Sequence, residues 1–352
     1  MKKKTVLFLY AEVMGYTLST IQSIASQGFE VYLVHWDKQK LTPYKVIKPS
    51  NIKIINRSEI NLSQLLSLTK KISPEITYIS GWQDKEYMRV AKWLRKNNSK
   101  VVVGFDDQWR GRIKQRIASI LGFFRFFSSY YSHAWVSGPP QFEYARRLGF
   151  KKNEIIFDLL SADLDLFHSA FDSSLKAKNK KYPHSFIFIG RFEKIKGVNI
   201  LLSAWKLIEK DRRDWSLKFV GNGSLKSLII ETKDVSAAEF LQPENLIKIV
   251  NSSGCLILPS LYEPWGLVIH EFAAAGLPLI SSDTVGANAS FLIPGLNGYE
   301  FKNNNVEDLA AALLKIINSS DSELIEFSMQ SHNLSYRVSS ETSARNFLSI
   351  AN

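Results

Sequence analysis

The sequence predicts an α/β protein of two Rossmann-like domains that face each other across a cleft. In the first half, short apolar runs alternate with segments of helical period. A polar, lysine-rich stretch without a period follows, and the alternation then starts again. Strands that alternate with helices favour a parallel sheet covered by helices. We therefore expect domains over 1–168 and 185–328, a linker over 169–184, and a C-terminal helix in 329–352 that packs back toward the N-terminal domain.

Four apolar runs predict the strands of the N-terminal domain. They are 4–10, 30–36, 76–80 and 100–105. Helices are expected over Tyr16–Gln27, which ends at Gly28, and around Glu86–Arg95. His133 lies at the start of another expected strand, and we interpret it as a structural residue.

The C-terminal domain repeats this alternation. Its expected strands are 186–192, 216–223, 255–260 and 278–282. Helices are expected over Gly197–Ile208, over Glu244–Asn251 and after Pro264. The tail beyond Asp308 also has a helical period.

The composition excludes several classes of protein. The chain has 352 residues, 45% hydrophobic and 22% charged, which suits a globular protein of two domains. No apolar run is long enough to span a bilayer, and the apolar start is interpreted as a buried strand rather than a signal peptide. Cys255 is the single cysteine, which excludes an intramolecular disulfide and a cysteine-based zinc site and favours a reducing cytoplasm.

The excess positive charge lies in the first half of the chain. The formal net charge is +12, and residues 1–168 contain 26 basic and 14 acidic residues. The remaining 19 basic and 19 acidic residues balance each other. This asymmetry indicates an anionic partner for the first half, and a membrane surface, a nucleic acid and a phosphorylated substrate all meet that description.

Glycines and basic residues follow two expected strands of the C-terminal domain. In "FIFIGRFEKIKG", Gly190 and Arg191 end a strand and Lys196 lies at the start of a helix. Arginine offers phosphate oxygens a planar fork and lysine a point charge, so this turn could clamp a diphosphate. A solvated basic loop is the alternative. Gly221, in "FVGNGS", would let a ligand approach the backbone closely, unless its glycines form a simple turn.

The segment "SLYEPWGLVIHEFAAAGLPLI" places two carboxylates on an otherwise apolar helix. Pro264 and Gly266 suit the first turn, whose free N–H groups would attract a phosphate or a hydroxyl-rich ligand. Glu263 lies beside that end, and Glu271 lies about two turns further in. A buried carboxylate needs a hydrogen-bonding partner. A ribose diol and a structural Lys or Arg are equally suitable partners for Glu271.

Together these motifs resemble the family 4 retaining glycosyltransferases, which have the GT-B fold. The resemblance rests on "GRFEKIKG", "VGNGS", "LPSLYEPWGLVIHE" and "AAAGLPLISSD", which occur in the family's order. It implies that Arg191 and Lys196 hold the donor diphosphate and that Glu271 binds the ribose of a nucleotide sugar. It also implies roles in holding the sugar, the phosphates or the base for Glu263, Gly190, Gly221, Trp265, Gly266, Leu267, Phe240 and Leu241.

The first half resembles the family more loosely. Gly15 stands where many members have a glycine-rich loop that approaches the donor phosphates. Many members carry a histidine near the sugar where this chain has Asp106 and Asp107, and a surface turn or helix cap is the alternative for these two. Asp163 and Asp165 form a D-x-D sequence, which we interpret as structural, and no metal is expected.

The resemblance implies transfer of a sugar from a nucleotide-diphosphate donor to an acceptor hydroxyl, with retained anomeric configuration and no cofactor. The expected acceptor is a glycan or lipid-linked glycan of a bacterial surface polymer, such as O-antigen, capsule or lipopolysaccharide. The expected location is the cytoplasm, at the inner face of the membrane. Alternatives with this fold are a nucleotide-sugar epimerase and a synthase acting on soluble sugar phosphates. The non-enzymatic alternative is a binder of anionic polymers, although no nucleic-acid motif occurs and nucleic acid is not an expected partner.

The segment Trp109–Phe127 is the part of the first half that we expect to face a membrane. Its basic residues would attract an anionic leaflet. Its apolar residues recur at helical spacing, and we expect this stripe to pack inside the domain. The stripe consists of Ile113, Ile117, Ile120, Leu121 and Phe124.

Overall fold

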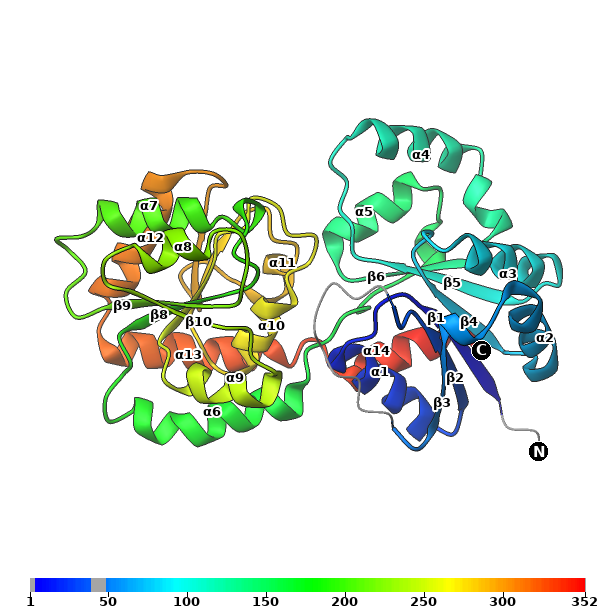
Figure 1. Ribbon diagram of the computed structural model, residues 1–352, viewed down its shortest axis with the longest axis horizontal. Coiled ribbons are helices and arrows are strands. Elements are labelled where there is room, and N and C mark those ends of the chain that lie inside the picture. The colour runs from blue at the N-terminus through cyan, green and yellow to red at the C-terminus, as the bar shows by residue number, and fades with distance from the viewer. Residues whose placement is uncertain (1–3, 39–48, 352) are drawn as a thin grey trace. The chain divides into compact units, whose positions relative to one another are not determined.

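The computed structural model describes residues 4–38 and 49–351 and divides the chain into two compact units (Figure 1). Unit 1 is Met1–Ser161 together with Val338–Asn352, and unit 2 is Ala162–Arg337. Each unit has one parallel sheet with helices on both faces. The prediction of two parallel α/β domains is confirmed.

Unit 1 contains a seven-stranded parallel sheet in the order β3-β2-β1-β4-β5-β6-β7. The strands are β1 (Thr5–Tyr10), β2 (Glu30–His35), β3 (Ile52–Asn56), β4 (Ile76–Ser80), β5 (Lys100–Phe105), β6 (His133–Val136) and β7 (Ile155–Ile156). In the register, Val6 of β1 is opposite Val31 of β2 on one side and Ile76 of β4 on the other. The chain order reverses between β1 and β4, and such sheets bind ligands beyond the carboxyl ends of the strands at this point.

Helices cover both faces of this sheet. They are α1 (Gly15–Ser26), α2 (Leu62–Ile72), α3 (Lys85–Lys96), α4 (Ile113–Phe123), α5 (Pro139–Arg147) and α14 (Ser340–Leu348). Val6 and Phe8 of β1 pack in one core cluster with residues of α1 and α14, and Leu7 and Leu9 pack in another with residues of α3. This alternation is the two-residue period of a strand that is buried on both faces.

The apolar stripe of α4 does not pack inside the domain, so this expectation was wrong. All five of its side chains, Ile113, Ile117, Ile120, Leu121 and Phe124, are exposed. The buried residues of α4 are instead Gln115 and Gly122, on the opposite side of the helix. Helical spacing identifies a stripe but does not determine which way it faces, because the opposite face can pack through small and polar residues.

Unit 2 contains a six-stranded parallel sheet in the order β10-β9-β8-β11-β12-β13. Its strands are β8 (Ser185–Ile189), β9 (Ser216–Val220), β10 (Val235–Ala238), β11 (Cys255–Leu258), β12 (Leu279–Ser282) and β13 (Gly298–Phe301). Its order reverses between β8 and β11. The carboxyl edge beside this reversal is again the place where a ligand is expected.

Eight helices are described in unit 2. They are α6 (Leu164–Lys178), α7 (Val198–Leu207), α8 (Lys226–Ile230), α9 (Pro243–Asn251), α10 (Leu267–Ala274), α11 (Asn288–Phe291), α12 (Val306–Asn318) and α13 (Asp321–Ser335). α7 and α12 cover one face of the sheet, and α6, α9, α10 and α13 cover the other (Figure 1). The core under α7 includes Trp205, Phe186 and Phe188.

Residues 169–184 were expected to form an irregular linker, and this was wrong because they lie mainly in α6. The carboxylate of Asp163 caps the start of this helix by accepting a hydrogen bond from Leu166 N. Phe167, Phe171 and Lys178 are buried on its inner side. The boundaries of the two units also differ from those of the expected domains, 1–168 and 185–328.

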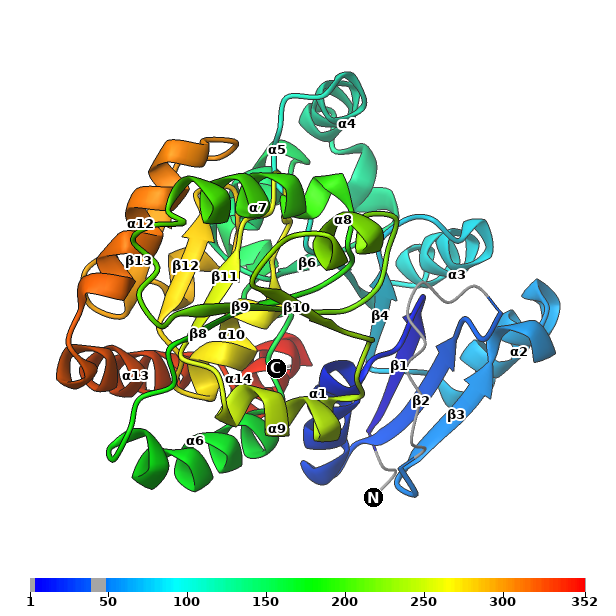
Figure 2. The same cartoon turned by 60° about the vertical axis from the view of Figure 1, so that its left-hand side comes forward.

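The C-terminal region 329–352 is not one helix. α13 ends at Ser335 in unit 2, and α14 begins at Ser340 in unit 1. In unit 1, α14 lies beside α1 (Figure 2). Phe347 of α14 stacks on Phe8 and on Trp135, with ring centroids 5.4 Å and 4.8 Å apart. α14 therefore completes the core of unit 1.

Candidate functional site

The residues that the sequence analysis selected in unit 2 lie at one edge of its sheet. Parallel strands have their carboxyl ends on the same side, so the loops that follow them gather there. Arg191 and Lys196 follow β8, Gly221 follows β9, and Glu263 follows β11. The fold thus brings together residues that are 72 positions apart in the sequence.

Backbone hydrogen bonds hold these loops against each other. Phe192 N donates to Asn222 O at 2.8 Å, which joins the loops after β8 and β9. Leu261 N donates to Ile195 O at 2.9 Å, which joins the loops after β8 and β11. The edge is therefore a connected backbone framework on which side chains can be positioned.

Lys196 and Glu263 form an ion pair at this edge, with 2.5 Å between Nζ and Oε2. Ser260 Oγ donates a hydrogen bond to the same Oε2 at 3.1 Å. The lysine and glutamate side chains are 19% and 13% exposed. An ammonium group has three N–H donors, so Lys196 can bind a second anion while Glu263 holds it in place.

Arg191 differs from Lys196 because its side chain is exposed. Within residues 4–38 and 49–351, its guanidinium makes no hydrogen bond and no ion pair. Its fork of N–H groups therefore has its hydrogen-bonding capacity available for phosphate oxygens.

The start of α10 requires glycine at position 266. Gly266 has a φ of +88°, and a Cβ there would lie 2.9 Å from Glu263 Cγ and from Val285 Cγ1. No side chain caps this helix. Because the first-turn N–H groups of a helix have no intrahelical acceptor, those of Leu267 and Val268 can bind an anion or a hydroxyl oxygen.

Glu271 lies within α10 and is partly buried. Burial raises the pKa of its carboxyl group to about 7, and the negative charge of Asp163 contributes to this increase. In the described part of the chain, the Glu271 carboxyl makes no hydrogen bond and no ion pair. The structural Lys or Arg partner that would explain this residue without a ligand is therefore not found among the described residues.

The other predicted donor-site residues have diverse surroundings. Gly190 and Gly221 end neighbouring strands, and a Cβ at Gly221 would lie 2.0 Å from Gly190 O. Phe240 is exposed and Leu241 is partly buried in the loop between β10 and α9. The indole of Trp265 is buried, so its backbone is the part that can serve a ligand.

The D-x-D sequence lies at the start of α6. Asp163 Oδ1 accepts a hydrogen bond from Leu166 N at 3.3 Å, and Asp165 lies in the first turn, where negative charge is favourable. Across residues 4–38 and 49–351, no group of three or more His, Cys, Asp or Glu side chains is arranged to hold a metal ion.

His270, the neighbour of Glu271, is a structural residue that the sequence analysis did not identify. Its Nδ1 accepts a hydrogen bond from Ala162 N at 3.0 Å, and its Nε2 donates to Ser335 O at 2.9 Å. Burial lowers the pKa of the imidazole to about 4. A neutral His270 therefore joins α10 to the segment before α6 and to the end of α13. A lone histidine in an apolar helix was the signal that could have indicated this role.

The predicted residues of unit 1 lie beyond the carboxyl ends of β1 and β5. Gly15 begins α1, which has no side-chain cap. Asp107 accepts hydrogen bonds from Gln108 N at 3.1 Å and from Gln115 Nε2 at 3.3 Å. Asp106 is exposed. These contacts favour a structural role for Asp107.

Asp107→Ala is expected to lower the free energy of unfolding by about 1 kcal/mol, because it removes the hydrogen bond that helps to position Gln115. Asp106→Ala is expected to change that free energy by less than about 0.5 kcal/mol. Urea unfolding of the two variants tests this difference. Equal destabilisation by both substitutions would contradict the separate roles, and turnover measured on the same variants shows whether Asp106 acts in the chemistry.

Unit 1 also has an open pocket that the sequence analysis did not predict. Its volume is ≈ 470 Å³, and it lies beyond the carboxyl ends of β2 and β3 and beside the start of α3. It is lined by Trp36, Asp37, Lys38, Arg57, Ser58, Gln83, Asp84 and Lys85. Most of these side chains can donate a hydrogen bond to a hydroxyl-rich ligand or accept one from it.

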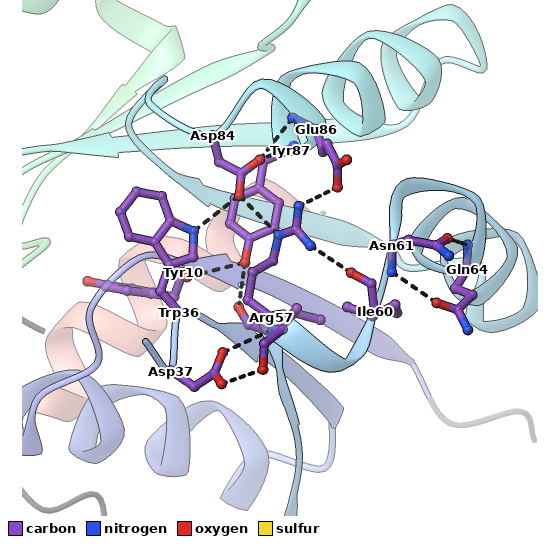
Figure 3. Close-up of polar contacts among 12 residues, drawn as sticks. Tyr10, Trp36, Asp37, Arg57, Ile60, Asn61, Gln64, Asp84, Glu86 and Tyr87 are labelled. Carbon is purple, nitrogen blue, oxygen red and sulfur yellow. Dashed lines mark hydrogen bonds and ion pairs between the residues drawn. The ribbon is translucent and has the colours of Figure 1, made fainter. Parts of the chain in front are cut away.

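Arg57 is the centre of a polar network beside this pocket (Figure 3). Its Nε donates to Asp84 Oδ2 at 3.0 Å, and its Nη2 pairs with Glu86. Trp36 Nε1 donates to the same Asp84 oxygen at 3.1 Å. Arg57 follows β3, a strand absent from the sequence prediction, so its position at the carboxyl edge could not be anticipated.

Residues 171–329 match the family model of the "Glycosyl transferases group 1". This stretch of the chain is therefore similar to the group 1 glycosyltransferases. Arg191, Lys196, Glu263 and Glu271 all lie within the matched residues, whereas Gly15 and the two aspartates of unit 1 lie outside them.

Two curated relatives each match less than half of the chain. Glycogen synthase of Mycobacterium tuberculosis is 30% identical over 142 residues, which are 38% of this chain and 34% of the relative. The poly(ribitol-phosphate) alpha-N-acetylglucosaminyltransferase of Staphylococcus aureus is 27% identical over 172 residues, 47% of this chain and 34% of the relative. The match thus spans about a third of each relative's length.

A solved structure extends the likeness from part of the chain to the fold of the whole chain. HepE from Anabaena, in complex with UDP-glucose, matches with a TM-score of 0.71 over 99% of each chain at 13% identity. Structural similarity at 13% sequence identity shows the fold of a chain but not its function. The fold of this chain is GT-B.

Proposed function

We propose that the chain is a retaining glycosyltransferase that moves a sugar from a nucleotide-diphosphate donor to an acceptor hydroxyl without a metal ion or organic cofactor. The observation that carries this proposal is the Glu271 carboxyl, which is partly buried and makes no hydrogen bond or ion pair with another described residue. It lies little more than one turn inside α10, the helix whose first-turn N–H groups have no side-chain cap. A ribose diol and a diphosphate are the ligand parts that suit these two positions.

A carboxylate and a set of positively charged and N–H groups at the carboxyl edge of unit 2 would hold different parts of the donor. Glu271 accepts hydrogen bonds from the ribose hydroxyls, and the first-turn N–H groups of α10 and the side chains of Arg191 and Lys196 bind the diphosphate. Glu263 positions Lys196 through their ion pair. The complex of HepE with UDP-glucose supports a nucleotide sugar as the ligand class.

In the proposed reaction, the bond between the anomeric carbon and the diphosphate oxygen breaks while the acceptor oxygen bonds to that carbon from the same face. The acceptor hydroxyl gives its proton to an oxygen of the leaving diphosphate. Negative charge therefore grows on the diphosphate, where Arg191 and Lys196 stabilise it more strongly in the transition state than in the ground state.

Glu271→Gln is expected to weaken binding of the nucleotide donor by about tenfold, because a charged acceptor of two hydroxyl groups is replaced by an amide. The measurement is the dissociation constant of UDP, GDP, ADP and dTDP, and of their sugars, by titration calorimetry. Glu231→Gln, at an exposed glutamate of the same unit, is the matched control. Unchanged affinity in a folded Glu271→Gln protein would remove the ribose assignment.

The acceptor that we propose is a glycan or lipid-linked glycan of a bacterial surface polymer, built at the cytoplasmic side of the membrane. The matched Staphylococcus relative, whose name describes sugar transfer to poly(ribitol-phosphate), supports this class of acceptor. The pocket of unit 1, with Trp36, Asp37 and Lys85 in its lining, is the proposed place for part of it.

Product analysis discriminates this proposal from its alternatives. A nucleotide-sugar epimerase would release an isomerised donor without any acceptor, and a synthase for soluble sugar phosphates would work without a lipid-linked or polymeric acceptor. A binder of anionic polymers would show no saturable binding of any nucleotide sugar.

A further inference from the structure

The outward side of α4 and the turn after it form an apolar surface on unit 1. Ile113, Phe123 and Phe124 are 77%, 82% and 74% exposed. These residue types usually lie in the interior of a protein, so a contiguous exposed group of them indicates an interaction site. The other members are Ile117, Ile120, Leu121 and Phe126, and we call the seven side chains the α4 apolar face.

The opposite side of α4 fixes the helix to the rest of unit 1. Gln115 is buried, and its Nε2 donates to Gln108 O at 2.7 Å. Near the other end, Gly122 packs so closely that a Cβ there would lie 2.5 Å from the carbonyl carbon of Leu148. The apolar face is thus held outward by a helix that is anchored through polar and glycine contacts.

The α4 apolar face lies in a segment with one sign of charge. Between Asp107 and Glu143 the sequence contains no acidic residue. The same segment contains five basic residues, Arg110, Arg112, Lys114, Arg116 and Arg125. At about 100° per residue, Lys114 and Arg116 lie on the two flanks of the apolar stripe, and both are exposed.

We infer that the α4 apolar face docks on an anionic lipid surface. An apolar stripe flanked by cations is the arrangement of helices that lie in the plane of a membrane interface, with apolar side chains below the headgroups and cations beside the phosphates. α4 has 11 residues. Among the described residues, no helix is long and apolar enough to cross a bilayer.

Charge favours lipid over a second copy of this chain as the occupant. A symmetric dimer through α4 would place Lys114 and Arg116 of one copy against the same cations of the other, which is unfavourable. An anionic leaflet supplies both an apolar layer and negative charge. This docking adds to the proposed sugar transfer and does not depend on it, because none of its residues was assigned to the donor site.

The test is co-sedimentation of the full chain with vesicles of phosphatidylcholine alone and of phosphatidylcholine mixed with phosphatidylglycerol, at low and high salt. The apolar variant carries Ile113→Ser, Ile117→Ser and Phe124→Ser. The charge variant carries Lys114→Gln and Arg116→Gln. The matched control carries Leu207→Ser, Leu228→Ser and Ile230→Ser, at exposed apolar residues of unit 2. Because the substituted apolar residues are exposed, all variants are expected to melt like the native protein.

We expect the native chain to prefer the anionic vesicles, and high salt to weaken this binding without abolishing it, because salt screens the cations but not apolar insertion. The apolar variant should lose at least about tenfold in affinity and its salt-resistant component. The charge variant should lose the preference for anionic vesicles. The control should bind like the native chain.

Binding of the apolar variant that equals native binding would overturn the inference. So would native binding that does not differ between the two vesicle types, or a native dimer that the apolar substitutions convert to a monomer. The thermal shift produced by UDP on the same variants separates this outcome from a failure of the proposed sugar transfer, since the α4 substitutions should leave any nucleotide binding unchanged.

Discussion

Arg191→Ala and Lys196→Ala are each expected to lower turnover by about a hundredfold or more while leaving the fold intact. Both cations lie at the carboxyl edge of unit 2, one exposed and one in an ion pair with Glu263. In the proposed reaction, the charge that they face grows as the diphosphate leaves. A single contact of this kind is commonly worth about 3 kcal/mol of transition-state stabilisation.

Lys194→Ala is the matched control for both substitutions. Lys194 belongs to the same short turn between β8 and α7, is exposed, and makes no ion pair with a described residue. Its removal changes the net charge equally but should leave turnover almost unaltered. Circular dichroism and the melting temperature show whether each variant is folded.

Near-normal turnover in either substituted enzyme would make that residue a solvated loop charge. The two results are separate tests, because among the described residues the Arg191 guanidinium makes no hydrogen bond or ion pair with Lys196 or Glu263. For Lys196→Ala, a raised KM with unchanged turnover would assign the lysine to ground-state binding of the donor rather than to the leaving group.

The elements that the sequence predicted best are long or strongly apolar. β1, β5 and β8 are almost entirely buried, so their runs of apolar residues stand out. β3 was missed because one of its five residues is buried and the rest are partly or fully exposed, which leaves little apolar pattern. α6 was missed although its buried residues recur at helical spacing, since Ser174 and Lys178 occupy two of those inner positions.

The sequence could not determine which face of α4 is buried, or which group pairs with the Glu271 carboxylate. Gln115 and Gly122 on the inner side of α4 carry no hydrophobic signal, so the outer stripe was wrongly placed inside. For Glu271, the ribose and the structural ion pair were equally compatible with the spacing. Only the three-dimensional arrangement reveals that no described cation reaches it.

The response of unit 2 to pH is expected to depend on two adjacent residues that act in opposite directions. The folded-state pKa of His270 is about 4, below its unfolded value of about 6.5. Between these values the unfolded chain binds a proton that the folded chain does not, so this contribution to stability is complete above pH 6.5 and is lost as pH falls. The folded-state pKa of Glu271 is about 7, above its usual value. Its contribution is therefore unfavourable near neutral pH and improves as pH falls.

Each contribution is worth about 2 kcal/mol between pH 7 and pH 5, and the two nearly cancel in the native protein. We expect Glu271→Gln to leave the histidine unopposed, so that the free energy of unfolding falls by about 2 kcal/mol more than in the native protein over this range. His270→Gln should change the slope by a similar amount in the opposite direction. The substitutions also have pH-independent costs, so the slope rather than the absolute stability is the quantity to compare.

Urea unfolding of the native protein and the two variants at both pH values measures these slopes. Other groups with shifted pKa values, such as His168 and Asp158, are present in all three proteins and cancel in the comparison. Parallel slopes in the native protein and His270→Gln would contradict a buried neutral imidazole between Ala162 N and Ser335 O. Parallel slopes in the native protein and Glu271→Gln would contradict the raised pKa of the Glu271 carboxyl group. They would indicate that a cation compensates its charge, and the reason for proposing Glu271 as the ribose ligand would then be lost.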